Sequence, residues 1–136
     1  MKKQLLLLLL AFATMQVYAA IESGKYYTIK NFSNTPAYMA DKEAADNQIT
    51  CVPVITSSAC WQFEATGNAD CYYVKNAATG RYIQGYTTSE EKVLMGDTGV
   101  EYSVKSFGNE DGRFGFACTS YNPHDFSTEG SLGLNL

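Results

Sequence analysis

An internal repeat constrains the fold of this chain more than any other feature of its sequence. The segment Tyr26–Asn31, which reads Y-Y-T-I-K-N, matches Cys71–Asn76, which reads C-Y-Y-V-K-N, at an offset of 45 residues. Each segment is followed by a short polar loop and an aromatic–aliphatic pair, Tyr38-Met39 in the first copy and Tyr82-Ile83 in the second. The chain is therefore expected to fold from similar units of forty-odd residues.

The match continues to the end of each copy. Trp61-Gln62-Phe63 corresponds to Tyr102-Ser103-Val104, and the offset falls to 41 because the loops differ in length. A third copy begins with the segment Asp111–Phe116, which follows the pattern of Asp70–Tyr73, but by comparison with the first two it is expected to lack two strands. The predicted units cover residues 24–68, 69–109 and 110–136, the last of them truncated.

Each unit offers four short strand candidates separated by turn-forming residues. In the first unit they lie near residues 25–31, 37–40, 48–54 and 60–65. Large apolar residues alternate with smaller or polar ones in these segments and therefore share one face. Because burial of an aromatic ring contributes a few kcal/mol, replacing the tryptophan with alanine should be among the most damaging substitutions. The predicted core comprises Tyr27, Ile29, Trp61, Phe63, Tyr72, Val74, Tyr82 and Tyr102.

The residue types agree with these strands. The chain has ten tyrosines and seven phenylalanines, together with many threonines, valines and glycines, a composition that suits pleated, half-buried strands better than helices. The fold class is predicted to be all-β. The residues after the leader described next make one domain, 20–136, of ordinary length.

The N-terminus has the layout of a secretory signal peptide over residues 1–19. Lys2 and Lys3 precede an apolar run from Leu5 to Ala13, and Val17-Tyr18-Ala19 provides a small residue at the cleavage position, so the mature chain should begin near Ala20. The apolar run is shorter than the roughly 20 residues of a membrane-spanning helix, and no later segment is apolar enough to span a membrane. We expect a protein that is secreted or periplasmic and has no membrane span.

Net charge narrows the possible partners. Removal of the leader leaves eight basic and fourteen acidic residues, so the net charge changes from −4 to −6. Affinity for nucleic acid depends mainly on neutralising phosphates, and the chain has no basic run or patch for that purpose. Nucleic acid is therefore not an expected partner.

Four cysteines follow the leader: Cys51, Cys60, Cys71 and Cys118. An even number of cysteines in an exported chain predicts two disulfides, and three pairings remain open. The alternative, a metal site, is not favoured because no two cysteines have CxxC spacing and His124 stands alone. No cofactor is expected.

Few residues suggest catalysis. His124 lies in the turn-rich stretch Tyr121–Asp125 and is expected to be an exposed loop histidine. Glu90 and Glu91 are adjacent, so on an extended strand their side chains would point to opposite faces. No nucleophile or metalloprotease motif and no phosphate-binding glycine loop is present, and we expect no enzyme activity.

Three motifs together resemble the ricin-type β-trefoil lectin-like domains of secreted Bacteroidota proteins. They are the Y-Y-x-I/V-K-N start, the G-R-Y-I turn and strand at Gly80–Ile83, and the W-x-F closing strand at Trp61–Phe63. The resemblance covers nearly all of the chain after the leader. It implies a β-trefoil, in which three four-stranded units form a short barrel and a cap of hairpins. The family's closing Q-x-W reads Ala59-Cys60-Trp61 and Val100-Glu101-Tyr102 here, so its glutamine is missing from both units.

The resemblance also implies where sugar would bind: an acidic residue after the second strand, a nearby aromatic platform and an amide. In the first unit these are Asp41 with Asn47 or Gln48, and in the second Gln84 takes the acidic position beside Tyr86. The alternative is that Asp41 belongs to an ordinary charged surface loop and that Gln84 and Tyr86 pack on the cap.

The sequence therefore favours an exported, non-catalytic carbohydrate-binding module that contacts a glycan or glycoprotein surface. Two alternatives stay open. One is a protein-binding trefoil such as an inhibitor or adhesion factor, and the other is a truncated accessory domain of a larger secreted glycoside hydrolase. The assignment of sugar binding follows from the resemblance, because a fold does not determine a function.

Overall fold

The computed structural model describes residues 21–31, 35, 37–42, 47–85, 92–106 and 114–119. Strands account for 49% of these residues, and the helical structure among them is one three-residue 3-10 turn, so the all-β prediction is confirmed. Over the described part of the chain, no helix reaches the length and hydrophobicity needed to cross a membrane. The predicted leader and Tyr86, Glu90, Glu91 and His124 lie outside the described residues.

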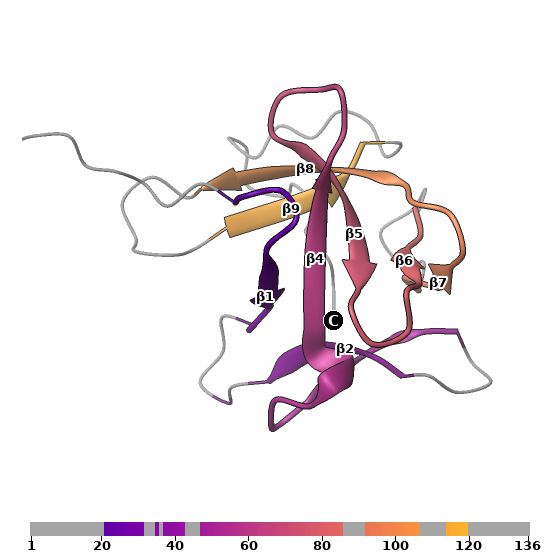
Figure 1. The fold of residues 1–136 in the computed structure, drawn as a ribbon. Helices are drawn as coiled ribbons and strands as arrows, with labels where there is room; N and C mark the ends of the chain where they lie inside the picture. The colour runs from indigo at the N-terminus through magenta and orange to yellow at the C-terminus, as the bar shows by residue number, and fades with distance from the viewer. Residues whose placement is uncertain are drawn as a thin grey trace, which may run out of the picture.

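Within the described residues, nine strands and one 3-10 helix follow one another (Figure 1). They are β1 (Tyr26–Thr28), β2 (Tyr38–Asp41), β3 (Ile49–Val52), η1 (Ser57–Ala59), β4 (Cys60–Ala65), β5 (Cys71–Asn76), β6 (Tyr82–Ile83), β7 (Met95–Gly96), β8 (Glu101–Ser106) and β9 (Phe114–Cys118).

Seven strands form one antiparallel sheet, and β2 and β3 form a separate hairpin. In the sheet, β4 pairs with β1 and β5, β5 also pairs with β6 and β8, and β8 pairs with β9. A bridge between Lys30 and Tyr38 joins the end of the β1 segment to β2, and a bridge between Gln48 and Leu94 joins the two hairpins. Among the described strands, β1 and β9 are not paired with each other, so the sheet does not close into a barrel there.

Strand pairs recur with equivalent registers. Tyr27 lies opposite Trp61 between β1 and β4, and Tyr72 lies opposite Tyr102 between β5 and β8. These two pairs are related by offsets of 45 and 41 residues, as in the sequence match. The hairpins correspond as well, because Met39–Cys51 in β2–β3 and Ile83–Met95 in β6–β7 are related by a common offset of 44.

The asparagine of each K-N motif bonds to the loop that follows it, and Asn76 is also the last residue of β5. The Asn76 amide donates to the carbonyl oxygen of Arg81 (2.8 Å), and its Oδ1 accepts hydrogen bonds from the amides of Ala78 (3.1 Å) and Thr79 (3.2 Å). In the first unit both bonds are made with Ala37: the backbone amide of Asn31 donates to its carbonyl oxygen, and Asn31 Oδ1 accepts from its amide, each at 2.9 Å. Asparagine favours this geometry because its side chain can replace backbone partners in a turn.

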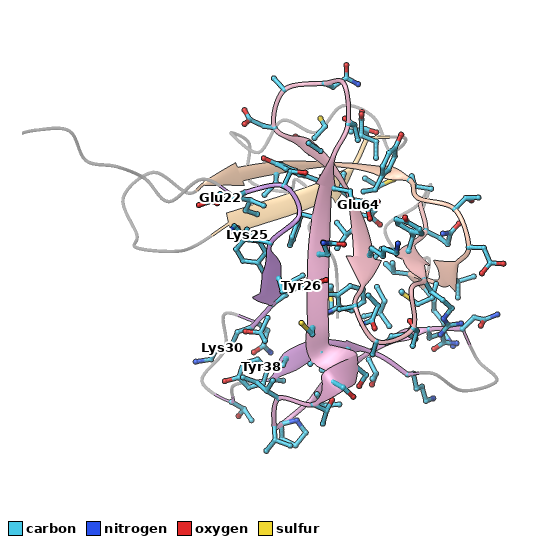
Figure 2. All side chains as sticks on the ribbon, viewed as in Figure 1. Glu22, Lys25, Tyr26, Lys30, Tyr38 and Glu64 are labelled. Atoms are coloured by element: carbon cyan, nitrogen blue, oxygen red, sulfur yellow. The ribbon has the colours of Figure 1, made fainter. Side chains whose placement is uncertain are left out.

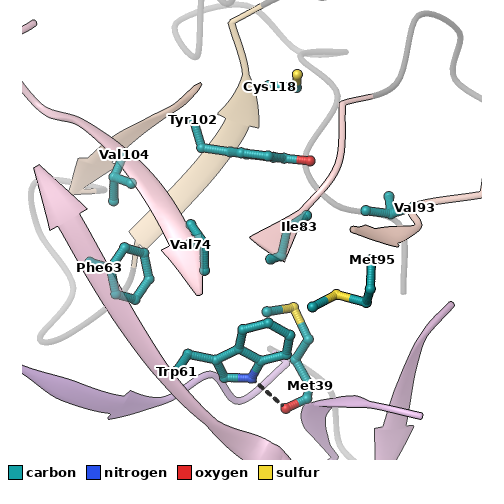
Figure 3. Close-up of a cluster of buried hydrophobic side chains, with 10 residues drawn as sticks. All are labelled: Met39, Trp61, Phe63, Val74, Ile83, Val93, Met95, Tyr102, Val104 and Cys118. Carbon is teal, nitrogen blue, oxygen red and sulfur yellow. Dashed lines mark hydrogen bonds between the residues drawn. The ribbon is translucent and has the colours of Figure 1, made fainter. Parts of the chain in front are cut away.

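The core lies between the sheet and the β2–β3 hairpin (Figure 3). Trp61 and Tyr102 are fully buried, and each donates its polar hydrogen to a backbone carbonyl: Trp61 Nε1 to Met39 (2.8 Å) and the Tyr102 hydroxyl to Gln84 (2.8 Å). Their polar atoms are therefore buried with partners. The cluster consists of Met39, Trp61, Phe63, Val74, Ile83, Val93, Met95, Tyr102, Val104 and Cys118.

Most residues of the predicted core lie in or against this cluster. Tyr27, Ile29 and Tyr72 are partly buried and pack against it, and the rings of Tyr27 and Tyr72 meet Phe63 edge to face at 5.5 and 5.8 Å between centroids. Tyr82 is an exception, because it is only half-buried and is not part of the cluster. Side chains alternate along β6, so Ile83 takes the inward position and Tyr82 faces the other side.

The two predicted disulfides are not present, because no disulfide bond joins any two of the four cysteines. Cys71 lies on β5 and Cys118 on β9, and β8 separates them. Two strand spacings amount to roughly 10 Å, which exceeds the Cα separation that a disulfide can bridge. Cys51 lies opposite Met39 in the hairpin, and Cys60 lies opposite Thr28 in the main sheet. Even cysteine number indicated paired cysteines, but strand placement separates them.

Candidate functional site

Asp41, predicted to contact sugar, is buried at the end of β2. Its Oδ2 accepts hydrogen bonds from Arg81 Nε (3.0 Å) and from the Thr79 hydroxyl (2.6 Å), and its Oδ1 accepts a charge-assisted bond from a terminal nitrogen of Arg81. Such a two-point arginine–carboxylate contact is directional and strong. The carboxylate is therefore used to join two parts of the fold.

Arg81 extends this contact to a second predicted sugar ligand. Its other terminal nitrogen donates to Oδ1 of Asn47, a residue with a positive φ of 49° that asparagine tolerates better than most residues. Asn76 is fully buried, and its side-chain nitrogen Nδ2 donates to the carbonyl of Ser58 (2.7 Å). We call Asp41, Asn47, Asn76, Thr79 and Arg81 the Asp41 cluster. It joins the β2–β3 hairpin to the turn after β5 and to η1.

Gln84, the third predicted ligand, also makes internal contacts. Its Nε2 donates to the carbonyls of Thr98 (2.7 Å) and Tyr82 (3.2 Å). Its side chain also lies against Gly96, where an added Cβ would come within 2.7 Å of Gln84 Cδ. The structure thus brings Asp41 and Asn47 together through Arg81 but keeps Gln84 in the other hairpin. Tyr86, the fourth, lies outside the described residues.

A different set of polar and aromatic side chains covers the side of the sheet opposite the core. Tyr26, Gln62, Lys75 and Tyr82 are consecutive cross-strand neighbours on β1, β4, β5 and β6, and so share one face. The next outward-facing pair lies two residues farther along β4 and β5 and consists of Glu64 and Tyr73. We call this set the outer-face strip: Tyr26, Gln62, Glu64, Tyr73, Lys75 and Tyr82.

The charged residues of the outer-face strip contact one another. Lys75 Nζ lies 3.6 Å from Glu64 Oε1 and 5.2 Å from the centre of the Tyr82 ring, and the Tyr82 hydroxyl donates to Glu64 Oε2 (3.0 Å). A hydrogen bond with Tyr82 and the negative charge of Glu64 raise the pKa of Lys75, so the amine stays charged at neutral pH. The pair leaves the strip without net charge.

Two tyrosines of the outer-face strip offer ring surface to solvent. Tyr26 has 65% of its surface exposed, and Figure 2 shows it beside β1, with Glu64 farther along β4. Tyr73 is 37% exposed, and its ring lies close to Gly99, where an added Cβ would come within 2.8 Å of the ring. Gln62 donates through Nε2 to the carbonyl of Gly24 (2.9 Å), which holds its amide next to Tyr26.

Two of the thiols, those of Cys51 and Cys71, are poor nucleophiles in this environment. Burial and the neighbouring charge of Glu101 raise the pKa of Cys71, and burial raises that of Cys51. A raised pKa leaves less thiolate, which is the reactive form.

Hydrogen bonds from Thr66 (2.6 Å) and Asn68 (2.9 Å) lower the pKa of Glu101 and keep it ionised. Among the described residues, no group of three His, Cys, Asp or Glu side chains is arranged to hold a metal ion.

Sequence reasoning did not single out the outer-face strip, although a signal for it was present. Trp61 and Phe63 were assigned inward, and the period of two places Gln62 and Glu64 on the opposite face. Which residues of β1 and β5 pair with Gln62 and Glu64 depends on the strand register, and the alternation pattern does not determine the register. Arg81 was part of the G-R-Y-I motif, but its partner Asp41 lies 40 residues earlier.

No protein-family model matches this chain, and neither a curated protein nor a solved structure shows a significant match. The function therefore has to be inferred from the contacts and exposures of the residues described above.

Proposed function

We propose that this chain is an exported, non-catalytic carbohydrate-binding module of the β-trefoil type, and that sugar contacts the outer-face strip rather than the Asp41 cluster. The observation that carries the proposal is the exposed ring of Tyr26 beside the amide of Gln62. An aromatic face can cover the apolar C–H side of a sugar ring, while an amide both donates to and accepts from hydroxyl groups. Glu64, on the same strand as Gln62, adds acceptor oxygens.

The trefoil assignment is supported by the recurring registers. The first strand of each of the first two units pairs with the fourth strand of the same unit, and that fourth strand pairs with the first strand of the next unit. The second and third strands form hairpins in both units. This is the order of pairing expected for a trefoil built from repeated four-stranded units.

A glycan array tests the proposal directly. Protein purified from cells that express the full chain should bind a defined group of glycans, and Tyr26→Ala should reduce the signal at least severalfold. Lys25→Ala, next to Tyr26 and also exposed, is the matched control and should bind as the unchanged chain does. An array without signal, or a Tyr26→Ala protein that binds at full strength, would contradict the proposal.

Export is tested on the same material. N-terminal sequencing of the protein recovered from the periplasm or the medium should begin near Ala20. Recovery only in the cytoplasm, with Met1 or Lys2 at the N-terminus, would contradict export.

A second candidate function, contact with a protein partner, is favoured by two adjacent exposed apolar residues. Val54 and Ile55 are 62% and 57% exposed, in the segment that follows β3. Adjacent exposed apolar side chains are a feature of protein contact surfaces. A protein partner captured by the unchanged chain, and lost in Val54→Ser/Ile55→Ser but retained in Tyr26→Ala, would favour this function over sugar binding.

A further inference from the structure

We infer that the outer-face strip accommodates an uncharged, linear oligosaccharide, with one sugar unit on Tyr26 and another on Tyr73. The inference rests on the proposed function, and it adds the ligand's length and charge. It follows from three features of the strip: the separation of its two exposed rings, the polar groups between them, and the charge balance.

The two rings are too far apart for one sugar. Tyr26 lies on β1 and Tyr73 on β5, and β4 runs between these strands. Tyr26 pairs with Gln62, and Gln62 pairs with Lys75 on β5. Tyr73 lies two residues from Lys75, so it is also displaced from Tyr26 by two residues along the strand direction. Two strand spacings of about 10 Å in total and a displacement of about 7 Å along the strand give roughly 12 Å between the Cα atoms. A single pyranose cannot stack on both rings, whereas a short chain can.

Hydrogen-bonding groups occupy the space between the rings. Gln62 lies opposite Tyr26, and Glu64 lies opposite Tyr73, so an amide and a carboxylate follow one another along β4. The amide nitrogen of Gln62 is engaged by Gly24, which leaves Oε1 to accept from a hydroxyl group. The order along the diagonal is therefore ring, amide, carboxylate, ring, and this order matches successive sugar units with apolar faces and polar edges.

Charge favours an uncharged ligand. Within the outer-face strip, Lys75 and Glu64 neutralise each other at 3.6 Å. Beyond Tyr73, Glu101 lies directly opposite on β8 and remains ionised because Thr66 and Asn68 donate to it. A glycan with carboxylate or sulfate groups would place like charge near Glu101, which disfavours binding at the Tyr73 end.

The experiment measures affinity against ligand length by calorimetry. Probes are the cello-, xylo-, manno- and N-acetylchito-oligosaccharides from monosaccharide to hexasaccharide, with oligogalacturonate as the charged comparison. For a series that binds, affinity should rise by roughly tenfold or more between monosaccharide and tetrasaccharide and then level off, as expected when a second ring contact of about 1.4 kcal/mol is added. Tyr73→Ala should remove this rise, so that long and short probes bind with similar affinity, and Tyr73→Phe should retain it.

Each outcome has a distinct meaning. If the monosaccharide binds as tightly as the hexasaccharide, or if Tyr73→Ala binds the long probes normally, the two-ring inference is wrong while sugar binding stands. If oligogalacturonate binds more tightly than the uncharged probes, the charge part of the inference is wrong. If no probe binds the unchanged chain while Tyr26→Ala and the unchanged chain capture the same protein partner, sugar binding itself is wrong, and the inference fails with it.

Discussion

The Asp41 cluster and the outer-face strip contain the same kinds of side chain, but they use them differently. Each has a carboxylate, an amide and a cation, and the strip adds exposed aromatic rings. In the cluster, Asp41 is buried and bonded to Arg81 and Thr79, so the polar groups bond within the protein. In the strip, Tyr26 is largely exposed, and Gln62 retains an acceptor oxygen. Residue type suggests a binding site, but exposure and unused hydrogen-bonding capacity identify one.

The sequence of each hairpin predicted a sugar site because the residue pattern has two possible uses. A carboxylate after a short strand with an amide a few residues later fits both a sugar site and a structural contact between units. Which of these two roles the carboxylate has depends on whether a cation from elsewhere in the chain binds it in the folded protein. Here Arg81, which follows the turn after β5, does so.

The strongest test of this division removes the cation of the Asp41 cluster. Arg81→Ala leaves the buried carboxylate of Asp41 without its charged partner, and breaking a buried pair in this way costs about 3–5 kcal/mol. Denaturant unfolding should show this loss, while the folded fraction should bind glycan as before. Lys25→Ala removes an exposed charge and is the control. An Arg81→Ala protein of unchanged stability would show that the cluster does not hold the hairpin.

A smaller loss is expected at Asn76. Asn76→Ala leaves the amides of Ala78 and Thr79 and the carbonyl of Ser58 without their side-chain partner, which costs about 1–3 kcal/mol. Asn76→Asp retains the acceptor oxygen but places a carboxylate oxygen against the carbonyl of Ser58, so it should also be less stable than the unchanged chain. Thermal unfolding measures all three proteins, and equal melting temperatures would contradict this account of the turn.

The pH dependence of stability should reveal Glu101. Hydrogen bonds from Thr66 and Asn68 lower its pKa in the folded state below the ordinary value of 4.5, so its contribution is fully present above that pH and is lost as the pH falls through the folded pKa. The contribution is about 1 kcal/mol or less because solvent screens the group. Melting temperatures should fall less steeply in acid for Glu101→Gln than for the unchanged chain. Parallel curves would rule out this role.

The smallest effect on stability is expected in the outer-face strip. Tyr26 is 65% exposed and is not in the core cluster, so Tyr26→Ala should change the free energy of unfolding by no more than about 0.5 kcal/mol while it weakens glycan binding. Chemical denaturation measured beside the affinity separates the two effects. A stability loss as large as that of Asn76→Ala would mean that Tyr26 serves the fold and not a ligand.

Much of the fold was predictable because it depends on local patterns. Alternation along the strands placed Trp61, Phe63 and Tyr102 on the inward face, where they are fully or nearly fully buried. The same rule was applied less well to Tyr82, since in a strand of two residues either one can face inward, and Ile83 does. Cysteine pairing failed for another reason, because an even count says nothing about which strands bring thiols within reach.

By itself, the sequence determined the all-β class, the strand positions and most of the inward faces. These features depend on periodicity and on contacts between residues close together in the chain. Only the tertiary structure decided that Arg81 reaches Asp41 across 40 residues, that Gln84 packs on Gly96, and that Tyr26 and Tyr73 share an outer face. Those outcomes depend on strand register and on which hairpin packs against which turn, and the physical reason is that a side chain's role depends on the partners the fold brings to it.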